Sequence, residues 1–285
     1  MRVAYLGPAG SYNEEALEAS IGESTVERLP QASIFEAVYA VEEGLVERAL
    51  VPFENSIEGS VRVTLDALAF DTERVRIVGE YDLPIRHNLI AREPLELERI
   101  VAVTSHPQAT AQCAKFLRTH LPDAELRSAA STSEAVRRVA ASTDPVAALG
   151  SAAAAAAYGC TILREEAEDT ADNVTRFVWL SGECEGSAAA GELPWRTTLV
   201  FSELGDDHPG ALVDALREFS DRGVNLTRIE SRPLRRGLGR YLFFIDLDGA
   251  ADGPVNATAI EALHAKAERV RILGSYPVGG AAPLR

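Results

Sequence analysis

Short apolar runs alternate with polar loops and helix-like segments over the first 180 residues. Residues 3–6 form an apolar run that ends in the tight loop GPAGS, and residues 33–44 place apolar side chains at helical spacing. An apolar run that enters a polar loop and then a helical pattern recurs at 48–52, 100–103 and 146–150. This alternation predicts an α/β domain with a mostly parallel sheet, which binds ligands at the carboxyl ends of its strands.

The remaining residues follow a second rhythm. Residues 182–194 (GECEGSAAAGELP) are small, polar and without periodicity, which predicts a linker. Beyond it, apolar alternation and helical spacing succeed one another in the order βαββαβ, with the strands and helices expected at 197–202, 208–220, 224–231, 241–247, 258–269 and 271–278. This order is typical of the ferredoxin-like fold. The chain therefore divides into domains at 1–181 and 195–278, with a tail at 279–285.

Charge is distributed unevenly between the two domains. The net charge is −15; residues 195–285 hold 12 basic and 12 acidic side chains, so the whole imbalance lies before them. An acidic surface argues against nucleic acid as a partner and against long-range attraction of an anionic substrate. An anion would have to be bound by a few local groups in a cleft.

The expected location is the cytoplasm. The first residues read as a strand and show no basic segment followed by an apolar stretch, so no secretory signal is predicted. No apolar run reaches the length of a membrane span, and no membrane partner is expected. Cys113, Cys160 and Cys184 have neither disulfide nor zinc spacing, which favours a reducing compartment.

The segment around residues 173–177 is the first candidate for chemistry. In a strand, Asn173, Thr175 and Phe177 share one face, and Arg176 points to the other unless the chain twists or bulges. The alternative is an ordinary edge strand built from common β-formers.

Two other polar clusters follow predicted strands. They consist of Glu54, Asn55 and Ser56, and of Ser105, His106, Pro107 and Gln108. The first suits hydrogen bonds to a carboxylate or hydroxyl, although an Asx-turn explains it equally well. In the second, backbone amides could hold an anion and the imidazole could act as an acid, but an N-cap before a helix explains the same residues. Metal, nucleotide and covalent-serine motifs are absent, and His87 reads as a structural histidine.

Taken together, six segments resemble the prephenate dehydratase family and its C-terminal ACT domain. They are residues 7–12 (GPAGSY), 51–61 (VPFENSIEGSV), 105–109 (SHPQA), 173–177 (NVTRF), 208–212 (HPGAL) and 226–233 (LTRIESRP). The resemblance runs in order over nearly the whole chain. It implies a catalytic domain with two lobes, similar to periplasmic binding proteins, at about 1–76 plus 160–181 and at 77–159.

The family reaction converts prephenate to phenylpyruvate, water and carbon dioxide, and it implies no cofactor or metal. By resemblance, Thr175 is required for dehydration as an oriented donor to the leaving hydroxyl, and Arg176 is expected to bind a substrate carboxylate through its planar fork. The proton could come from His106 or Glu54. The other polar and lining residues expected at the site are Ser11, Asn55, Ser56, Ser105, Gln108, Asn173 and Phe177.

The resemblance also implies that phenylalanine binds between paired ACT domains and inhibits. The residues expected there are Asp207, His208, Gly210, Ala211, Leu212, Asn225, Leu226, Glu230 and Ser231. A homodimer or a dimer of dimers is expected, because pairing would cover exposed sheet edges. Arogenate dehydratase and a non-catalytic, amino-acid-responsive binding protein remain alternatives.

Overall fold

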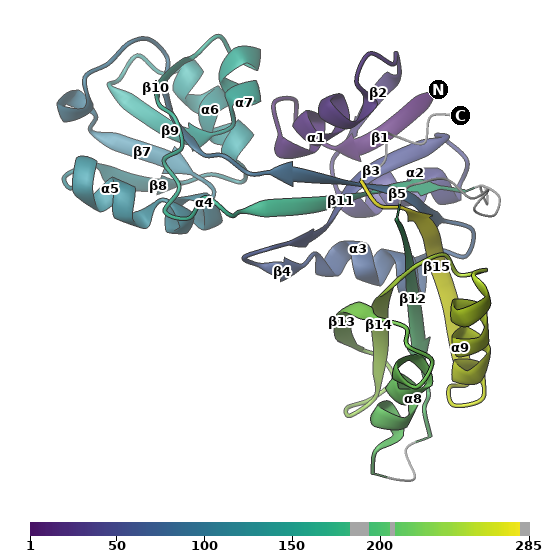
Figure 1. Ribbon diagram of the computed structural model, residues 1–285. Coiled ribbons are helices and arrows are strands. Elements are labelled where there is room, and N and C mark those ends of the chain that lie inside the picture. The colour runs from purple at the N-terminus through teal and green to yellow at the C-terminus, as the bar shows by residue number, and fades with distance from the viewer. Residues whose placement is uncertain (183–193, 206–208, 280–285) are drawn as a thin grey trace.

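A computed structural model describes residues 1–182, 194–205 and 209–279. Within these ranges the chain forms two α/β lobes and a C-terminal domain that packs against the first lobe (Figure 1). Most of the predicted linker, the candidates Asp207 and His208, and residues 280–285 of the tail lie outside the described residues.

The first lobe is a sheet with helices on both faces. Its strands run in the order β5-β11-β3-β1-β2, with the short β4 paired to β3. Its elements are β1 (Arg2–Leu6), α1 (Tyr12–Ile21), β2 (Glu27–Gln31), α2 (Ile34–Glu42), β3 (Arg48–Asn55), β4 (Gly59–Ser60), α3 (Arg62–Asp66), a π-helical turn (Ala67–Asp71), β5 (Arg76–Pro84) and β11 (Val174–Ser181). Apolar residues of α1 cover one face of the sheet, and those of α2 and α3 cover the other.

The second lobe has its own five-stranded sheet, in the order β10-β6-β9-β7-β8. Its elements are β6 (Asn88–Ala91), a 3-10 turn (Leu97–Arg99), β7 (Ala102–Ser105), α4 (Pro107–Gln112), α5 (Ala114–His120), β8 (Glu125–Ser128), α6 (Thr132–Ala140), β9 (Val146–Gly150), α7 (Ala152–Ala157) and β10 (Thr161–Arg164). Helices α6 and α7 bury apolar side chains on one face of this sheet, and α5 does so on the other.

Two chain segments connect the lobes, one after β5 and one before β11 (Figure 1). The two-lobed α/β architecture is confirmed, but the predicted lobe boundaries are not those of the sheets. Residues 77–84 belong to the first sheet and 161–164 to the second. The prediction of mostly parallel sheets is also wrong, because β11 returns from the second lobe antiparallel to both β3 and β5.

The C-terminal domain has the predicted βαββαβ order. Its elements are β12 (Trp195–Ser202), α8 (Ala211–Ser220), β13 (Leu226–Pro233), β14 (Tyr241–Asp248), α9 (Pro254–His264) and β15 (Arg269–Pro277). Helices α8 and α9 pack on one face of the sheet. The other face shares a hydrophobic core with the first lobe, in which Val200, Phe244 and Leu273 join Val38, Phe53 and Leu68.

The two domains also share one sheet. β15 pairs with β5 at a single position, Gly274 opposite Ile77, so nine strands follow one another from β13 to β2. A Cβ atom at Gly274 would lie 2.1 Å from the carbonyl oxygen of Ile77, which leaves room only for glycine. The C-terminal domain is therefore seated on the first lobe by backbone contact as well as by side chains.

Four strands went unrecognised in the sequence: β2, β4, β8 and β10. Strands β2 and β8 are edge strands, and all of β8 and most of β2 is exposed. An edge strand that buries little has no alternation of apolar and polar residues to reveal it. Strand β5 ends at Pro84 and β6 begins at Asn88, and the chain crosses between the lobes in the segment that joins them.

Candidate functional site

A cavity of about 310 Å³ lies between the two lobes. Its walls come from α1, the ends of β3 and β11, the segment after β5, α4 and the start of α6. Six of the residues predicted at the site line it: Asn55, His106, Gln108, Asn173, Thr175 and Phe177. The size is at the lower end of the range for small-molecule sites, and the position is at the carboxyl end of β3.

A β-bulge turns Asn55 toward this cavity. Opposite β11, Thr175 pairs with Asn55 and Arg176 with Glu54, but Phe177 pairs with Pro52, which leaves Phe53 as an extra residue. Simple alternation from Phe53, which packs in the core shared with the C-terminal domain, would direct Asn55 to that same face. Bulges of this kind re-aim side chains beside active sites.

The amide of Asn55 has one possible orientation. Its Oδ1 accepts the backbone N–H groups of Ile57 and Glu58, each at 3.0 Å. Its Nδ2 therefore donates, to Oδ1 of Asn173 at 2.7 Å and to Oγ1 of Thr175 at 2.9 Å. Because Thr175 accepts this bond, its own hydroxyl proton remains available for a group in the cavity.

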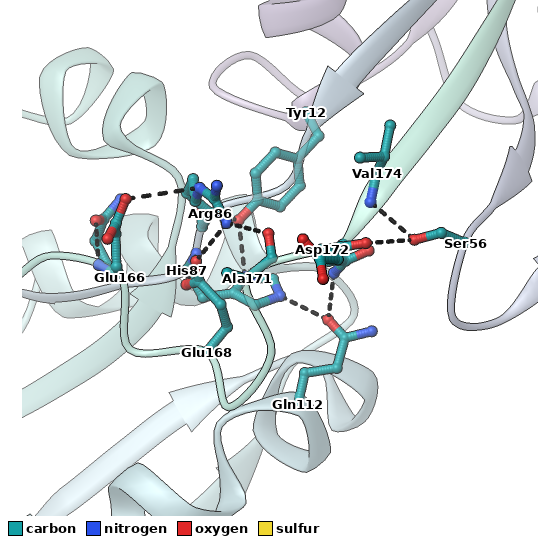
Figure 2. Close-up of polar contacts among 12 residues, drawn as sticks. Tyr12, Ser56, Arg86, His87, Gln112, Glu166, Glu168, Ala171, Asp172 and Val174 are labelled. Atoms are coloured by element: carbon teal, nitrogen blue, oxygen red, sulfur yellow. Dashed lines mark hydrogen bonds and ion pairs between the residues drawn. The ribbon is translucent and has the colours of Figure 1, made fainter.

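The hydrogen bonds of Asn173 and Gln112 also fix the position of the proton on His87 (Figure 2). Asn173 donates through Nδ2 to Oε1 of Gln112 at 3.0 Å, and that oxygen lies 2.8 Å from Nε2 of His87. Since the oxygen can only accept, Nε2 of His87 carries a proton. On its other side, Nδ1 lies 2.8 Å from the hydroxyl of Tyr12, which can donate to it or to the carbonyl of Arg86 at 2.7 Å.

Burial keeps both His87 and Tyr12 in their neutral forms. His87 is 3% exposed, and desolvation lowers its pKa although Gln112 and Glu168 act in the opposite direction. Burial also raises the pKa of Tyr12 well above its usual value. Both groups are therefore neutral near pH 7, and His87 is held in the Nε2–H form.

The two chain segments that connect the lobes lie beside the cavity. Glu168 accepts the backbone N–H of His87 at 2.8 Å and pairs with Arg86 at 3.2 Å. Ser56 does not line the cavity: its hydroxyl donates to the carbonyl of Asp172 at 2.9 Å and accepts the N–H of Val174 at 3.0 Å (Figure 2). Ser56 thus joins the end of β3 to the start of β11.

Helix α4 supplies one wall. His106 is its N-cap and accepts the N–H of Gln108 on Nδ1 at 3.3 Å, so the neutral imidazole carries its proton on Nε2. Ser105, by contrast, is fully buried and donates to the carbonyl of Leu149 at 2.9 Å. Ser11 caps α1 and donates to the carbonyl of Leu6. Neither serine lines the cavity, so the structure gives both a structural role.

The structure does not bring Arg176 and Glu54 to the cavity, which corrects both predictions. Arg176 points from the opposite face of β11, where its Nη2 lies 2.6 Å from Asp246 and 3.0 Å from Glu54. Glu54 also lies 3.5 Å from Arg228. Strand alternation places Arg176 there, and the bulge at Phe53 places Glu54 opposite it.

Neither aspartate nor glutamate is among the described residues that line the cavity. No lysine or arginine is among its lining residues in the described part of the chain. Two of its lining residues have buried polar atoms without a hydrogen-bond partner, Oδ1 of Asn13 and Nε2 of Gln112. Buried polar atoms normally find partners, so these two are open to a bound molecule.

The described ranges contain neither a cluster of His, Cys, Asp and Glu suited to a metal ion nor a helix long and apolar enough to cross a membrane. The predictions that no metal and no cofactor take part stay predictions.

A second cavity, of about 530 Å³, lies in the C-terminal domain. Ala211 and Leu212 line it, and Gly210 precedes them with φ of +101°. The other described residues predicted for the effector lie elsewhere. Asn225 donates to Asp248, Leu226 packs in the domain core, Glu230 accepts from Ser60 of the first lobe, and Ser231 is exposed on β13.

Residues of the site that were missed in the sequence include Tyr12, His87 and Gln112, and also Asn13, Ser131 and Thr132. Tyr12 and Gln112 lie within or beside recognised segments, but their helical positions gave no reason to single them out. His87 was assigned a structural role because it stood in a strand pattern. A histidine at the end of an apolar run, close to Pro84, was the available signal for a chain crossing.

Comparison with known proteins covers the whole chain. The family model for prephenate dehydratase matches residues 3–185, and the ACT domain model matches 199–265. A prephenate dehydratase of Mycobacterium tuberculosis is 39% identical over 99% of this chain and 88% of its own. One from Lactococcus lactis is 38% identical over 98% of both chains.

Solved structures agree. A prephenate dehydratase from Arthrobacter aurescens, in complex with L-Phe, has a TM-score of 0.87 and 38% identity over 99% of this chain and 94% of its own. A structure described as GqqA, a novel type of quorum quenching acylases, has a TM-score of 0.85 and 29% identity over the full length of both chains. Two domain models in the right order, and full-length relatives well above 30% identity, show that this chain belongs to the prephenate dehydratase family.

Proposed function

We propose that this protein converts prephenate to phenylpyruvate in phenylalanine biosynthesis and that Thr175 assists departure of the ring hydroxyl. The observation that carries the proposal is the bond from Asn55 to Oγ1 of Thr175, which leaves the threonine proton to be donated into the cavity. Loss of carbon dioxide supplies the electron pair that expels hydroxide and makes the ring aromatic. A donor oriented toward developing negative charge on the leaving oxygen lowers that barrier.

The carboxylates of prephenate would be bound without a fixed cation. The cavity includes the first residues of α6, Ser131 and Thr132, and the start of α4 at His106 and Gln108. Free backbone N–H groups at the starts of helices attract anions. The unpartnered Nε2 of Gln112 adds a neutral donor.

His106 is our candidate for the group that protonates the departing hydroxide. Its Nε2–H is free while Nδ1 is held by the backbone of Gln108, and its side chain lines the cavity. Glu54 is no longer a candidate, because it faces Arg176 and Arg228. His106→Gln keeps a hydrogen-bond donor but has no proton to transfer, so kcat should fall in the folded variant if His106 is the acid, and an unchanged kcat would remove His106 from the mechanism.

The direct test is incubation with prephenate while the absorbance of phenylpyruvate is followed. Arogenate in parallel decides between the two dehydratase activities. Prephenate that binds in calorimetry without product would instead support the binding-protein alternative. An acylase would need an activated nucleophile, and in the described residues neither histidine of the cavity is hydrogen-bonded to a serine, threonine or cysteine hydroxyl or thiol.

We also propose that phenylalanine acts as effector through the C-terminal domain. Leu212 lines the cavity there, whereas its neighbour Val213 is 52% exposed. Leu212→Glu should therefore abolish phenylalanine binding in calorimetry, and Val213→Glu is the matched control. Equal binding by both variants would remove this cavity from effector binding.

Self-association is the remaining part of the proposal. Strand β13 ends the sheet of the C-terminal domain and exposes every second residue, with Ile229 50% exposed. Such an edge favours pairing with a second copy. Light scattering that reported a monomer at micromolar concentration would contradict it. The cytoplasmic location stays a prediction, which fractionation of cells would test.

A further inference from the structure

Thr175 and Arg176 are neighbours on β11 that serve opposite faces. Thr175 and Phe177 lie on the face of β11 that lines the cavity, which is the face that α1 covers. Arg176 points to the C-terminal domain, where Nη2 lies 2.6 Å from Oδ2 of Asp246 on β14. One peptide unit therefore separates the hydroxyl proposed to act on substrate from a direct ion pair with the other domain.

Asp246 is held in place from its own domain. The residue is fully buried, and its Oδ1 accepts from Thr198 of β12 at 2.8 Å. The hydroxyl of Thr198 lies 2.8 Å from that of Tyr276 on β15. Burial acts to lower the pKa of Arg176, but its interactions with Asp246, Tyr276 and Glu54 together outweigh burial, and the pKa is raised. Arg176 thus remains a cation anchored to the centre of the C-terminal sheet.

Further ion pairs surround this contact. Glu80 of β5 lies 3.6 Å from Arg176 and 2.5 Å from Arg196 of β12. Arg176 and Arg228 each lie 4.9 Å from the ring centroid of Phe53. Phe53 is the extra residue of the bulge that directs Asn55 into the cavity. The interface charges therefore contact both strands that carry the polar groups of the site.

These charges are incompletely paired. Five of the ten buried polar side-chain atoms that lack a hydrogen bond in the described residues belong to this cluster, namely Oε1 of Glu80, Nε of Arg176, Nε of Arg196, and Nε and Nη1 of Arg228. Buried ion pairs often add no stability over apolar residues of similar volume, and incomplete pairing makes this worse. The cluster is better explained by the need to fix positions than by a need for stability.

We propose that Asp246 is a positioning residue for Thr175, which acts through Arg176, so that catalysis depends on how the C-terminal domain is seated. The proposal rests on the proposed function. The register shift between Arg176 and Phe177 interrupts the pairing of β11 with β3 beside Thr175, while the pairing with β5 continues, so the ion pair of Arg176 adds a restraint where the pairing with β3 is interrupted. A displacement of about 1 Å of a catalytic group can lower a rate by about 10²-fold.

The test compares two carboxylates that both bind arginine across the domain boundary. Asp246→Asn removes the charge beside Arg176. Asp66→Asn is the matched control, since Asp66 of α3 binds Arg232 at 2.7 Å and Arg235 at 2.9 Å but contacts neither β11 nor Arg176. Turnover of prephenate by the wild type is measured first, and its absence would refute the proposed function and this proposal with it.

With an active wild type, Asp246→Asn should lower kcat by about tenfold or more with KM within about twofold, and Asp66→Asn should change neither. Hydrogen exchange should rise at residues 174–177 only in Asp246→Asn. A normal kcat in folded Asp246→Asn, or an equal loss in Asp66→Asn, would overturn the proposal. If Asp246→Asn does not fold, Thr198→Val decides: it frees Oδ1 of Asp246 and should lower kcat about threefold, whereas wild-type kcat would refute the positioning role.

Discussion

The cavity and the domain interface lie on opposite faces of the same two strands, and they are built from different chemistry. The cavity face of β3 and β11 offers the neutral side chains of Asn55, Asn173 and Thr175. The interface face carries Arg176, which forms a buried ion pair with Asp246 and a partly exposed one with Glu54. Amides and hydroxyls are oriented by one another at the cavity, whereas full charges are confined to the face that substrate does not reach.

This difference shows where each kind of interaction is useful. A cation paired with the side-chain carboxylate of prephenate would bind the product as strongly as the substrate. A cation paired with the ring carboxylate would hold back the group that must leave as carbon dioxide. Oriented dipoles act on charge that develops at one atom, which is what lowers a barrier. At the interface nothing has to leave, so strong and permanent charge pairs can serve to hold domains in one arrangement.

The largest expected effect is a loss of stability when a charge on the interface face is removed. Arg176→Met leaves Asp246 buried without its cation, whereas Glu80 keeps Arg196, and the free energy of unfolding should fall by about 3–5 kcal/mol in urea. Arg137→Met, which breaks an exposed pair with Glu134, should leave it unchanged. A rise in KM for prephenate in folded Arg176→Met, without loss of stability, would show instead that Arg176 binds the substrate.

The cavity face should show the reverse pattern. Thr175→Ala should lower kcat by about 10²-fold, because one oriented donor is lost, while the melting temperature changes little. Thr175→Ser keeps the hydroxyl and should retain most of the activity. Near-normal turnover in a folded Thr175→Ala protein would remove the hydroxyl from the mechanism.

Substitutions of His87 test whether activity depends on the whole row of hydrogen-bonded amides or only on Asn55, which contacts Thr175. Glutamine can replace the Nε2–H that faces Gln112, and asparagine can replace only the Nδ1 side that faces Tyr12. We expect His87→Asn to lower kcat about tenfold and His87→Gln to remain within about threefold, as for loss of a supporting hydrogen bond. Equal activity of the two variants would show that the position of Gln112 does not depend on His87.

The smallest effect is a pH dependence of stability. His87 is buried neutral with a lowered pKa, so below about pH 6.5 the unfolded chain binds a proton that the folded protein excludes. Stability should therefore fall as pH drops from about 6.5 toward the folded pKa, and His87 should contribute no slope above that. Melting temperatures between pH 5 and 8 should show a shallower acid limb in His87→Gln; an identical limb would contradict the assignment.

The amino-acid sequence determined a large part of this picture by itself. Alternation of short apolar runs and helical patterns predicted an α/β domain, and the order βαββαβ predicted the C-terminal domain, because these periodicities reflect which side chains are buried. The division of the first domain into two lobes was implied only by the family resemblance. The polar clusters at Asn55, at His106 and Gln108, and at Thr175 also reach one cavity. Strand ends are local features, but these are the carboxyl end of β3, the start of the antiparallel β11 and the carboxyl end of β7 in the other sheet, which meet at the cavity between the lobes.

Tertiary structure alone decided the partner of Arg176 and the face to which Glu54 points. Alternation already directed Arg176 away from Thr175, but only the packed C-terminal domain supplies Asp246, 70 residues further along the chain, as its partner. The bulge at Phe53 arises from pairing between β3 and β11 and reverses the faces of Glu54 and Asn55. His87 acquired its tautomer from a chain of amides that four separate segments bring together. Such partners depend on contacts between distant residues, and local periodicity carries no record of them.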